Sequence, residues 1–272
     1  MKTRILIIIG FVSLLLSCEE VPVRLPSAPD PGGGVYTQNV LIEEYTGVRC
    51  QNCPAGAQLL EELKRIHGDR LVILSIHGGF FAQPANLENK FRLDNAFGAA
   101  MIRLFNEPLG YPSAMISRKI FDGQSSRFLG GGFWAGYIDE EKNKDPLIGM
   151  ALKIVSDFNQ RKLQIKVLTE ALSDQSQSLS LSIVLTENNI RDAQLTPTGV
   201  DTNYIHRHVM RSFITSISGD PIGILPVNVI KTFEYASGYS EEWKTAELRV
   251  IAFIHEPAPS FRVLQVVEGK ID

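Results

Sequence analysis

The sequence predicts a chain in two parts, an α/β domain followed by an all-β domain. An apolar, β-branched run over residues 40–46 is followed by a helical pattern from Pro54 and by a second apolar run over residues 71–77. This strand, helix, strand order is typical of a parallel α/β sheet. After the polar segment 143–146 the pattern changes to short alternating runs with polar turns, which is typical of antiparallel sheets.

The chain begins with the layout of an export signal. Two basic residues precede an apolar run over residues 5–16, which is too short to cross a bilayer, since a spanning helix takes about 20 residues. The run ends in Leu-Leu-Ser-Cys, and this motif resembles the lipobox of bacterial lipoproteins, where the cysteine is acylated. We therefore predict a signal peptide over residues 1–17 and a lipid anchor to the membrane on Cys18. An ordinary cleaved signal beside a chance cysteine is the alternative.

Residues 18–35 are expected to form a flexible tether between the lipid and the fold. They contain four prolines, three consecutive glycines and no hydrophobic period. Glu19 and Glu20 follow the predicted anchor, and acidic residues at this place resemble the signal that sends Bacteroidetes lipoproteins to the cell surface. A charged linker without a targeting role is the alternative.

Composition and charge give no indication of a nucleic-acid partner, a cofactor or a metal site. The formal net charge is −3 and no basic cluster is visible, so we expect no nucleic-acid partner. No cofactor is predicted. A metal site is not expected, because structural zinc takes four ligands and the sequence has one close pair of thiols with no His-x-x-His nearby.

Cys50 and Cys53 form a close pair in a C-x-x-C motif between the first strand and the first helix. The chain has three cysteines, and Cys18 is assigned to the lipid, so Cys50 and Cys53 can pair only with each other within the chain. Export compartments are oxidising, so we expect a disulfide unless a partner reduces it. The helix N-terminus favours a thiolate at the first cysteine, and the spacing lets the second resolve a mixed disulfide.

In this setting the sequence resembles the thioredoxin superfamily. Glu44 lies six residues before the first cysteine, where thioredoxins place a buried acid behind the second. The Gly-Tyr-Pro-Ser segment that contains Pro112 resembles the cis-proline loop that packs against the motif. Two departures stand out: Arg49 occupies a position where many thioredoxins have tryptophan, and a helical pattern over residues 84–104 makes the segment before the proline longer.

The resemblance implies a role for each of these residues within a thioredoxin-like domain over residues 36–145. Cys50 would be the attacking thiolate and Cys53 the resolving thiol. Glu44 would accept a proton, since a buried carboxyl has a raised pKa, and Pro112 would hold an extended substrate chain. The alternatives are an inert structural disulfide, an exposed Glu44 and an ordinary trans Pro112.

Residues 146–272 are expected to form the second domain. Seven runs are typical of strands, several with one apolar and one polar face: 147–156, 162–172, 178–187, 205–217, 227–235, 246–255 and 261–268. Seven short strands with polar turns predict an immunoglobulin-like antiparallel sandwich. His206 and His208 stand two apart, hence on one strand face. We interpret them as an exposed or edge-strand pair, because the sequence identifies no further metal ligands beside them.

The whole arrangement resembles the 28-kilodalton outer membrane protein family of Bacteroidetes. The resemblance rests on Glu43–Gly47 running into the motif at Cys50–Pro54, and on the segment His206–Arg211. It implies a lipid-anchored protein of the outer membrane, exposed on the cell surface if the acidic signal acts. It implies little about activity.

Two functions of different classes remain open. The first is thiol–disulfide exchange on exported or surface proteins that the sandwich recruits. It is favoured because four residues, Glu44, Cys50, Cys53 and Pro112, stand where the thioredoxin motif has its functional positions. The second is a non-catalytic binding or assembly subunit of an outer-membrane or surface complex, with the disulfide as a staple. The second is favoured by a large β domain in which no catalytic residues are recognised, and by Arg49 in place of the tryptophan of many thioredoxins. The oligomeric state stays open.

Overall fold

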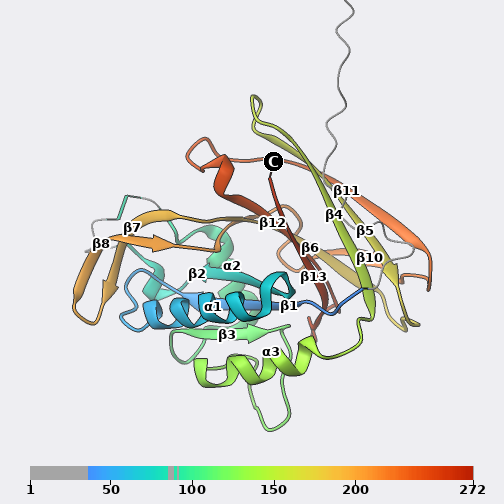
Figure 1. Cartoon of the computed structure of the whole chain (residues 1–272), viewed down its shortest axis with the longest axis horizontal. Coiled ribbons are helices and arrows are strands. Elements are labelled where there is room, and N and C mark those ends of the chain that lie inside the picture. Colours follow the sequence, from blue (N-terminus) through green and yellow to red (C-terminus); the bar gives the residue numbers. More distant parts are fainter. Residues whose placement is uncertain (1–35, 85–88, 91, 272) are drawn as a thin grey trace, which may run out of the picture.

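A mixed β-sheet runs through the fold and joins its two halves (Figure 1). The computed structural model describes residues 36–84, 89–90 and 92–271, and the predicted signal peptide, tether and Cys18 lie outside these residues. Within them the sheet has the strands β1 (Val40–Thr46), β2 (Leu71–His77), β3 (Ser113–Ile116), β6 (Leu179–Glu187), β9 (Val209–Phe213), β10 (Asp220–Gly223), β12 (Leu248–His255) and β13 (Val263–Lys270). Their order is β13-β12-β6-β9-β2-β1-β3, and β10 pairs with β6.

β1 and β2 are parallel neighbours, with Val40 opposite Leu71 and Thr46 opposite His77. The helix α1 (Cys53–His67) makes the crossover between them. Every residue of both strands is buried, as a sheet covered on both faces requires. The predicted strand, helix, strand unit with a parallel pair is therefore confirmed.

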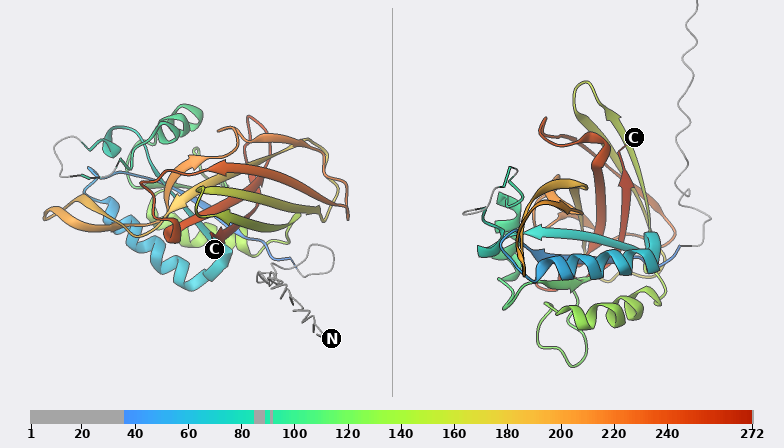
Figure 2. Two further views of the ribbon diagram at one scale, coloured as in Figure 1. Left: turned by 90° about the horizontal axis from the view of Figure 1, so that it is seen from above. Right: turned by 60° about the vertical axis from the view of Figure 1, so that its left-hand side comes forward.

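Helices cover both faces of this part of the sheet (Figure 2). α1 and α3 (Trp134–Lys142) pack on one face, in an apolar cluster that includes Val40. α2 (Ala96–Phe105) packs on the other face, in a cluster that includes Leu41. Successive residues of a strand point to opposite faces, which is why two neighbours in β1 belong to different clusters.

The predicted helical insertion is present as α2, which begins later than the pattern suggested. The side chain of Asn95 accepts hydrogen bonds from the backbone N–H groups of Phe97 and Gly98, both over 3.0 Å. An asparagine in this position caps a helix because it satisfies N–H groups that have no partner inside the helix. The cap therefore sets the first residue of α2.

A second, antiparallel sheet consists of β4 (Ile148–Asp157), β5 (Lys162–Ala171) and β11 (Ile230–Gly238), in the order β11-β5-β4. It shares an apolar core with β6 and β12 of the large sheet, to which Leu163 and Leu181 contribute. Two layers of antiparallel strands therefore enclose one core here, as a sandwich does.

One layer of this sandwich continues into the α/β sheet, which differs from the separate immunoglobulin-like unit that the sequence predicted. The join is β9: Val209 lies opposite Ser75 of β2, and the Ser75 N–H donates to the carbonyl oxygen of His208 over 2.8 Å. β2 would otherwise end the α/β sheet with unpaired N–H and C=O groups. β9 supplies their partners from far along the chain.

β7 (Ile190–Thr196) and β8 (Gly199–His206) form a two-stranded hairpin outside both sheets, at the left of Figure 1. The sequence predicted no strand before residue 205 in this region. The run predicted over 205–217 is in fact the end of β8 followed by β9. The two strands are separated at His208, where the backbone leaves the extended conformation and has a φ of 55°.

Four 3-10 turns complete the regular structure of the described residues: Gly68–Arg70, Phe80–Ala82, Gly131–Phe133 and Thr245–Glu247. None of the helices in the described part of the chain combines the length and the apolar character that crossing a bilayer requires.

Candidate functional site

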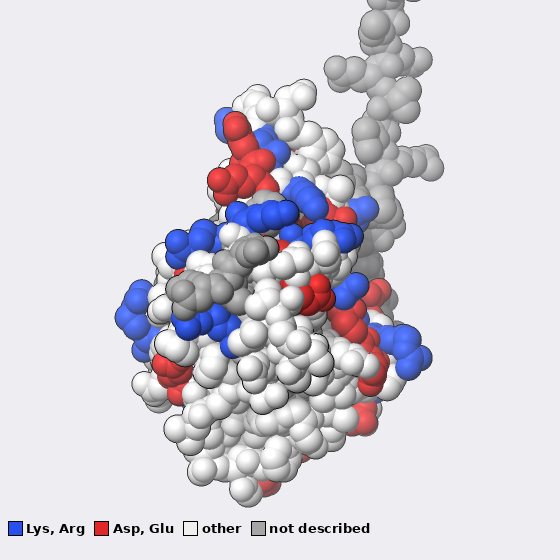
Figure 3. Space-filling model, turned by 90° about the vertical axis from the view of Figure 1, so that its left-hand side faces the viewer, with Lys and Arg blue, Asp and Glu red and all other residues white. Residues whose placement is uncertain are grey.

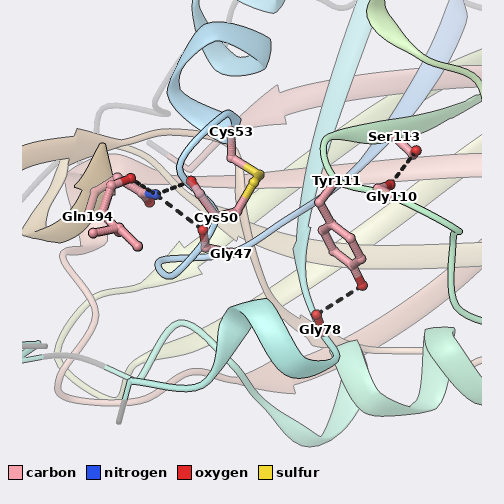
Figure 4. Close-up of a disulfide and its surroundings, with 9 residues drawn as sticks. Gly47, Cys50, Cys53, Gly78, Gly110, Tyr111, Ser113 and Gln194 are labelled. Atoms are coloured by element: carbon pink, nitrogen blue, oxygen red, sulfur yellow. Dashed lines mark hydrogen bonds between the residues drawn. A yellow bond between two sulfur atoms is a disulfide. The ribbon is translucent and has the colours of Figure 1, made fainter. Parts of the chain in front are cut away.

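Cys50 and Cys53 are joined by a disulfide where β1 leads into α1 (Figure 4). Cys53 is the first residue of the helix, and its N–H donates to the carbonyl oxygen of Cys50 over 3.3 Å. Both residues are buried, with 3% and 2% of their surface exposed. The N-terminus of a helix stabilises negative charge, so this position favours a thiolate when the disulfide is reduced.

Glu44 lies in β1 and is 1% exposed, so it is not the exposed charge that one alternative allowed. Its Oε2 accepts a hydrogen bond from the Ser75 hydroxyl over 3.3 Å, and its Oε1 has no partner in the described protein. Burial raises the pKa of Glu44 to about 8, and the Ser75 hydrogen bond offsets part of that rise. The carboxyl can therefore take up or release a proton near neutral pH.

Pro112 follows a cis peptide bond and lies against the first turns of α1. The contact is at Gly56, where a Cβ would lie 2.7 Å from Pro112 Cγ and 3.0 Å from Glu44 Oε1. The neighbouring Tyr111 hydroxyl donates to the carbonyl oxygen of Gly78 over 3.2 Å (Figure 4). The structure thus brings the proline, the buried carboxyl and the disulfide-bearing helix together, and only a glycine fits where they meet.

Gly56→Ala is expected to lower the free energy of unfolding by about 1–3 kcal/mol, because the added methyl must displace Pro112 or the Glu44 carboxyl. Gly136 of α3 is a matched control, since nothing lies within 4 Å of a Cβ built there. Gly136→Ala should stabilise the protein by about 0.4–1 kcal/mol. Urea unfolding followed by circular dichroism measures both changes. A Gly56→Ala protein as stable as the wild type would contradict the contact.

The β7–β8 hairpin holds the turn that carries the disulfide. The side-chain amide of Gln194 donates to the carbonyl oxygens of Gly47 and Cys50, over 3.2 and 3.0 Å (Figure 4). The backbone N–H of Leu195 donates to the carbonyl oxygen of Val48 over 2.8 Å. These bonds satisfy buried carbonyl groups of an irregular segment, which would otherwise be costly.

Sequence reasoning missed this hairpin, although a turn signal was present. Thr-Pro-Thr-Gly at residues 196–199 joins β7 to β8, and proline followed by glycine is typical of a tight turn. The flanking residues alternate too weakly to suggest strands, because β8 is exposed over its first five residues.

A cavity of about 660 Å³ lies beside Cys53, lined by α1, β1, β2 and β8. The sheet contributes Glu44 and His77, the helix contributes Glu61, and the hairpin contributes His206. This volume falls in the range of sites that hold small molecules. The cavity reaches the disulfide from the side of the second cysteine.

The cavity also explains the histidines of the second half of the chain. His206 ends β8, which is an edge strand because it pairs with β7 alone, but its side chain is buried with 4% of its surface exposed. Its ring centroid lies 5.7 Å from that of His77, while His208 contacts Glu61 through Nε2 over 3.1 Å. Burial lowers the pKa of His206 to about 4 and holds the pKa of His77 well below its usual range. Both rings are therefore neutral at pH 7.

The surface near the disulfide carries Arg49, at the place where many thioredoxins have tryptophan. Its guanidinium lies 4.7 Å from the ring centroid of Phe80, which is 58% exposed. Figure 3 shows the face on which the hairpin lies: Lys and Arg side chains form a band across it, with Asp and Glu side chains near the ends of the band.

No group of three His, Cys, Asp or Glu side chains that could hold a metal ion occurs among the residues that the structure describes.

Comparison with known proteins concerns mainly the second half of the chain. A family model described as outer membrane protein Omp28 matches residues 100–272. That match includes Pro112 and the hairpin and leaves out the disulfide. No curated protein matches the sequence.

Solved structures extend the comparison to most of the chain. HBP35 of Porphyromonas gingivalis has a TM-score of 0.69 at 17% identity, covering 88% of this chain and 77% of that one. A protein of Agrobacterium tumefaciens has a TM-score of 0.56 at 11% identity, covering 87% and 96%. A domain of the outer membrane lipoprotein Omp28 from Porphyromonas gingivalis has a TM-score of 0.33 at 15% identity, covering 47% and 91%. At these identities, the first two show a similar fold and nothing about activity.

Proposed function

The chain belongs to the Omp28 family of outer membrane proteins, and we propose that it is a lipid-anchored member that carries out thiol–disulfide exchange on exported or surface proteins. The observation that carries the proposal is the juxtaposition of a disulfide at a helix N-terminus with a buried carboxyl and Pro112. Acylated Cys18 would hold the protein at the outer membrane. The part of the chain over residues 36–145 would act as a thioredoxin-like domain.

In the reduced protein, the Cys50 thiolate would attack a disulfide of the substrate. A mixed disulfide forms at Cys50 and one substrate sulfur leaves as a thiolate, which takes a proton from water. The Cys53 thiol then gives its proton to the Glu44 carboxylate and attacks the Cys50 sulfur. The Cys50–Cys53 disulfide re-forms, the second substrate sulfur leaves, and two electrons have passed to the substrate. The same steps in reverse oxidise a substrate dithiol.

Glu44 suits this role because its surroundings set its proton affinity. A carboxyl with a pKa of about 8 is partly ionised near neutral pH and can accept the proton of a buried thiol. Pro112, packed against the same helix, would position the substrate chain beside the sulfur atoms. A dithiol protein of the cell envelope would have to supply electrons, since an exported chain has no access to cytoplasmic reductants.

Cys53→Ala is expected to trap substrates, because the mixed disulfide at Cys50 cannot be resolved without the second thiol. Epitope-tagged protein purified from envelope fractions under non-reducing conditions should show adducts of higher mass that dithiothreitol releases. The matched control is Cys50→Ala, which lacks the attacking sulfur and should show none. Equal adducts in both variants, or none in either, would count against exchange chemistry.

One observation favours a second function, that of a binding or assembly subunit with a structural disulfide. Both cysteines are buried, and the hairpin hydrogen bonds from Gln194 close over the turn. The reduction potential separates the two functions. A reduction potential of the Cys50–Cys53 disulfide well below about −300 mV is typical of a structural disulfide, whereas thiol–disulfide exchange requires a higher value.

A further inference from the structure

Four residues that line the cavity beside Cys53 each have a buried polar atom with no hydrogen-bonding partner in the described protein. These atoms are Glu44 Oε1, His77 Nδ1, His206 Nε2 and His208 Nδ1. Buried polar atoms in folded proteins normally have partners, either in the protein or in what it binds. Their concentration at one cavity points to a ligand that supplies those partners.

Two of the four atoms are acceptors, because the other nitrogen of each ring is already engaged. The Nε2 of His208 lies 3.1 Å from the Glu61 carboxylate, which accepts a hydrogen bond there, so in the neutral ring Nδ1 carries the lone pair. The ring of His206 donates to the backbone of β7 at residues 192–193, which leaves its Nε2 as the lone-pair nitrogen. The residues around the cavity thus include two acceptors without a partner.

The charge of the lining points the same way. Glu61 and Asp201 line the cavity together with Glu44, and Arg207 is the one Lys or Arg side chain among the described lining residues. Apolar side chains such as Leu60 of α1 form part of the wall. Such a lining attracts cations that carry N–H donors and some apolar surface.

We infer that this cavity binds a small organic ammonium compound. Its N–H groups would donate to the acceptors at Glu44, His206 and His208, and its carbon chain would lie against the apolar wall. A metal ion is a poorer occupant, because no three ligating side chains of the described residues are grouped to hold one. An anion would meet three carboxyl groups and a single arginine. The inference concerns the disulfide-bonded protein and does not depend on thiol exchange.

The test is calorimetric titration of the mature wild-type protein with 1,4-diaminobutane and with spermidine. Two compounds of similar length, uncharged 1,4-butanediol and anionic succinate, are the comparisons. We expect one saturable site for the amines, with an affinity at least about tenfold higher than that for butanediol, because charge-assisted hydrogen bonds exceed neutral ones by that margin. Succinate should not bind.

A second readout identifies the site. Glu44 is mostly protonated at pH 7, and a bound ammonium group favours its carboxylate, so binding to the wild type should release a proton. The heat of binding will then depend on the ionisation enthalpy of the buffer. Glu44→Gln should abolish this dependence and weaken amine binding by about tenfold or more. Glu62→Gln, on an exposed residue of α1 outside the lining, should change neither.

Three results would overturn the inference: no saturable binding of either amine, butanediol binding as tightly as diaminobutane, or equal loss of binding in the two glutamine variants. Should Glu44→Gln fail to fold, the wild-type titrations with the four compounds and with two buffers still decide the outcome. None of these results bears on the trapping experiment with Cys53→Ala.

Discussion

Arg118→Met is expected to destabilise the protein by about 3–5 kcal/mol, because it leaves the buried carboxylate of Glu43 without its partner. Both side chains have no exposed surface, and two hydrogen bonds join them: Arg118 Nε donates to Glu43 Oε2 over 2.8 Å and Nη2 donates to Oε1 over 2.7 Å. The guanidinium also lies 4.9 and 4.8 Å from the ring centroids of Phe105 and Phe253. Urea unfolding gives the free energy directly.

The surface pair Lys166–Glu234 provides the matched control. Its side chains are 50% and 64% exposed, so Lys166→Met should cost less than about 1 kcal/mol. The double variant Glu43→Leu/Arg118→Met should regain much of the loss, since it removes both buried charges. A cost for Arg118→Met no larger than that for Lys166→Met would show that Glu43 is not held by this pair.

The contribution of Glu44 to the stability of the wild type is expected to fall by about 2 kcal/mol between pH 6.5 and pH 8, measured as the difference between the wild type and Glu44→Gln. Burial raises the pKa of Glu44 from 4.5 to about 8. Between those values the folded protein keeps a proton that the unfolded chain releases, so stability decreases as pH rises. The contribution is complete below pH 4.5 and is lost as the pH passes 8.

The comparison with Glu44→Gln isolates Glu44. Burial lowers the pKa values of His77, His206 and His255, so stability falls with acid as the unfolded chain takes up protons around pH 6.5. This effect opposes that of Glu44 near pH 6.5 and is the same in both proteins. Urea unfolding at pH 6.5, 7.25 and 8 measures the slope for the wild type, Glu44→Gln and the exposed control Glu62→Gln. A wild-type slope equal to that of Glu44→Gln would show that Glu44 does not contribute to it.

Three features of the site could be predicted from the sequence: the buried carboxyl, the cysteine pair at a helix N-terminus, and the proline beside it. The place of Glu44, six residues before Cys50, predicted a buried acid through the resemblance to thioredoxins, and Glu44 is 1% exposed. A cysteine directly before Pro54 predicted that the pair would lie at a helix N-terminus, and the helix begins at Cys53. The packing of Pro112 against the motif was predicted only by the resemblance of Gly-Tyr-Pro-Ser to the cis-proline loop, and the structure places Pro112 against that helix.

Most contacts between distant parts of the chain could not be predicted, because the pattern of residues within a strand does not show which distant segment packs against it. Gln194, in the hairpin that holds the C-x-x-C turn, lies 144 residues from Cys50 in the chain, and the backbone of Leu195 adds a second contact to the same turn. His206 and His208 were expected to share a strand face, but the strand ends at His206 and the backbone of His208 has a positive φ. In the structure they lie at the same cavity as His77 and Glu44.

By itself the sequence determined the export signal pattern, the strand, helix, strand unit, the cysteine pair and a β-rich second half, since each depends on neighbours in the chain. The tertiary structure decided how the halves join. β9 pairs with the open edge of β2, and this joins the sandwich and the α/β part into one sheet. It also decided the surroundings of the cysteine pair, because burial, unpaired acceptors and shifted pKa values arise only when segments from both halves exclude water from the same place.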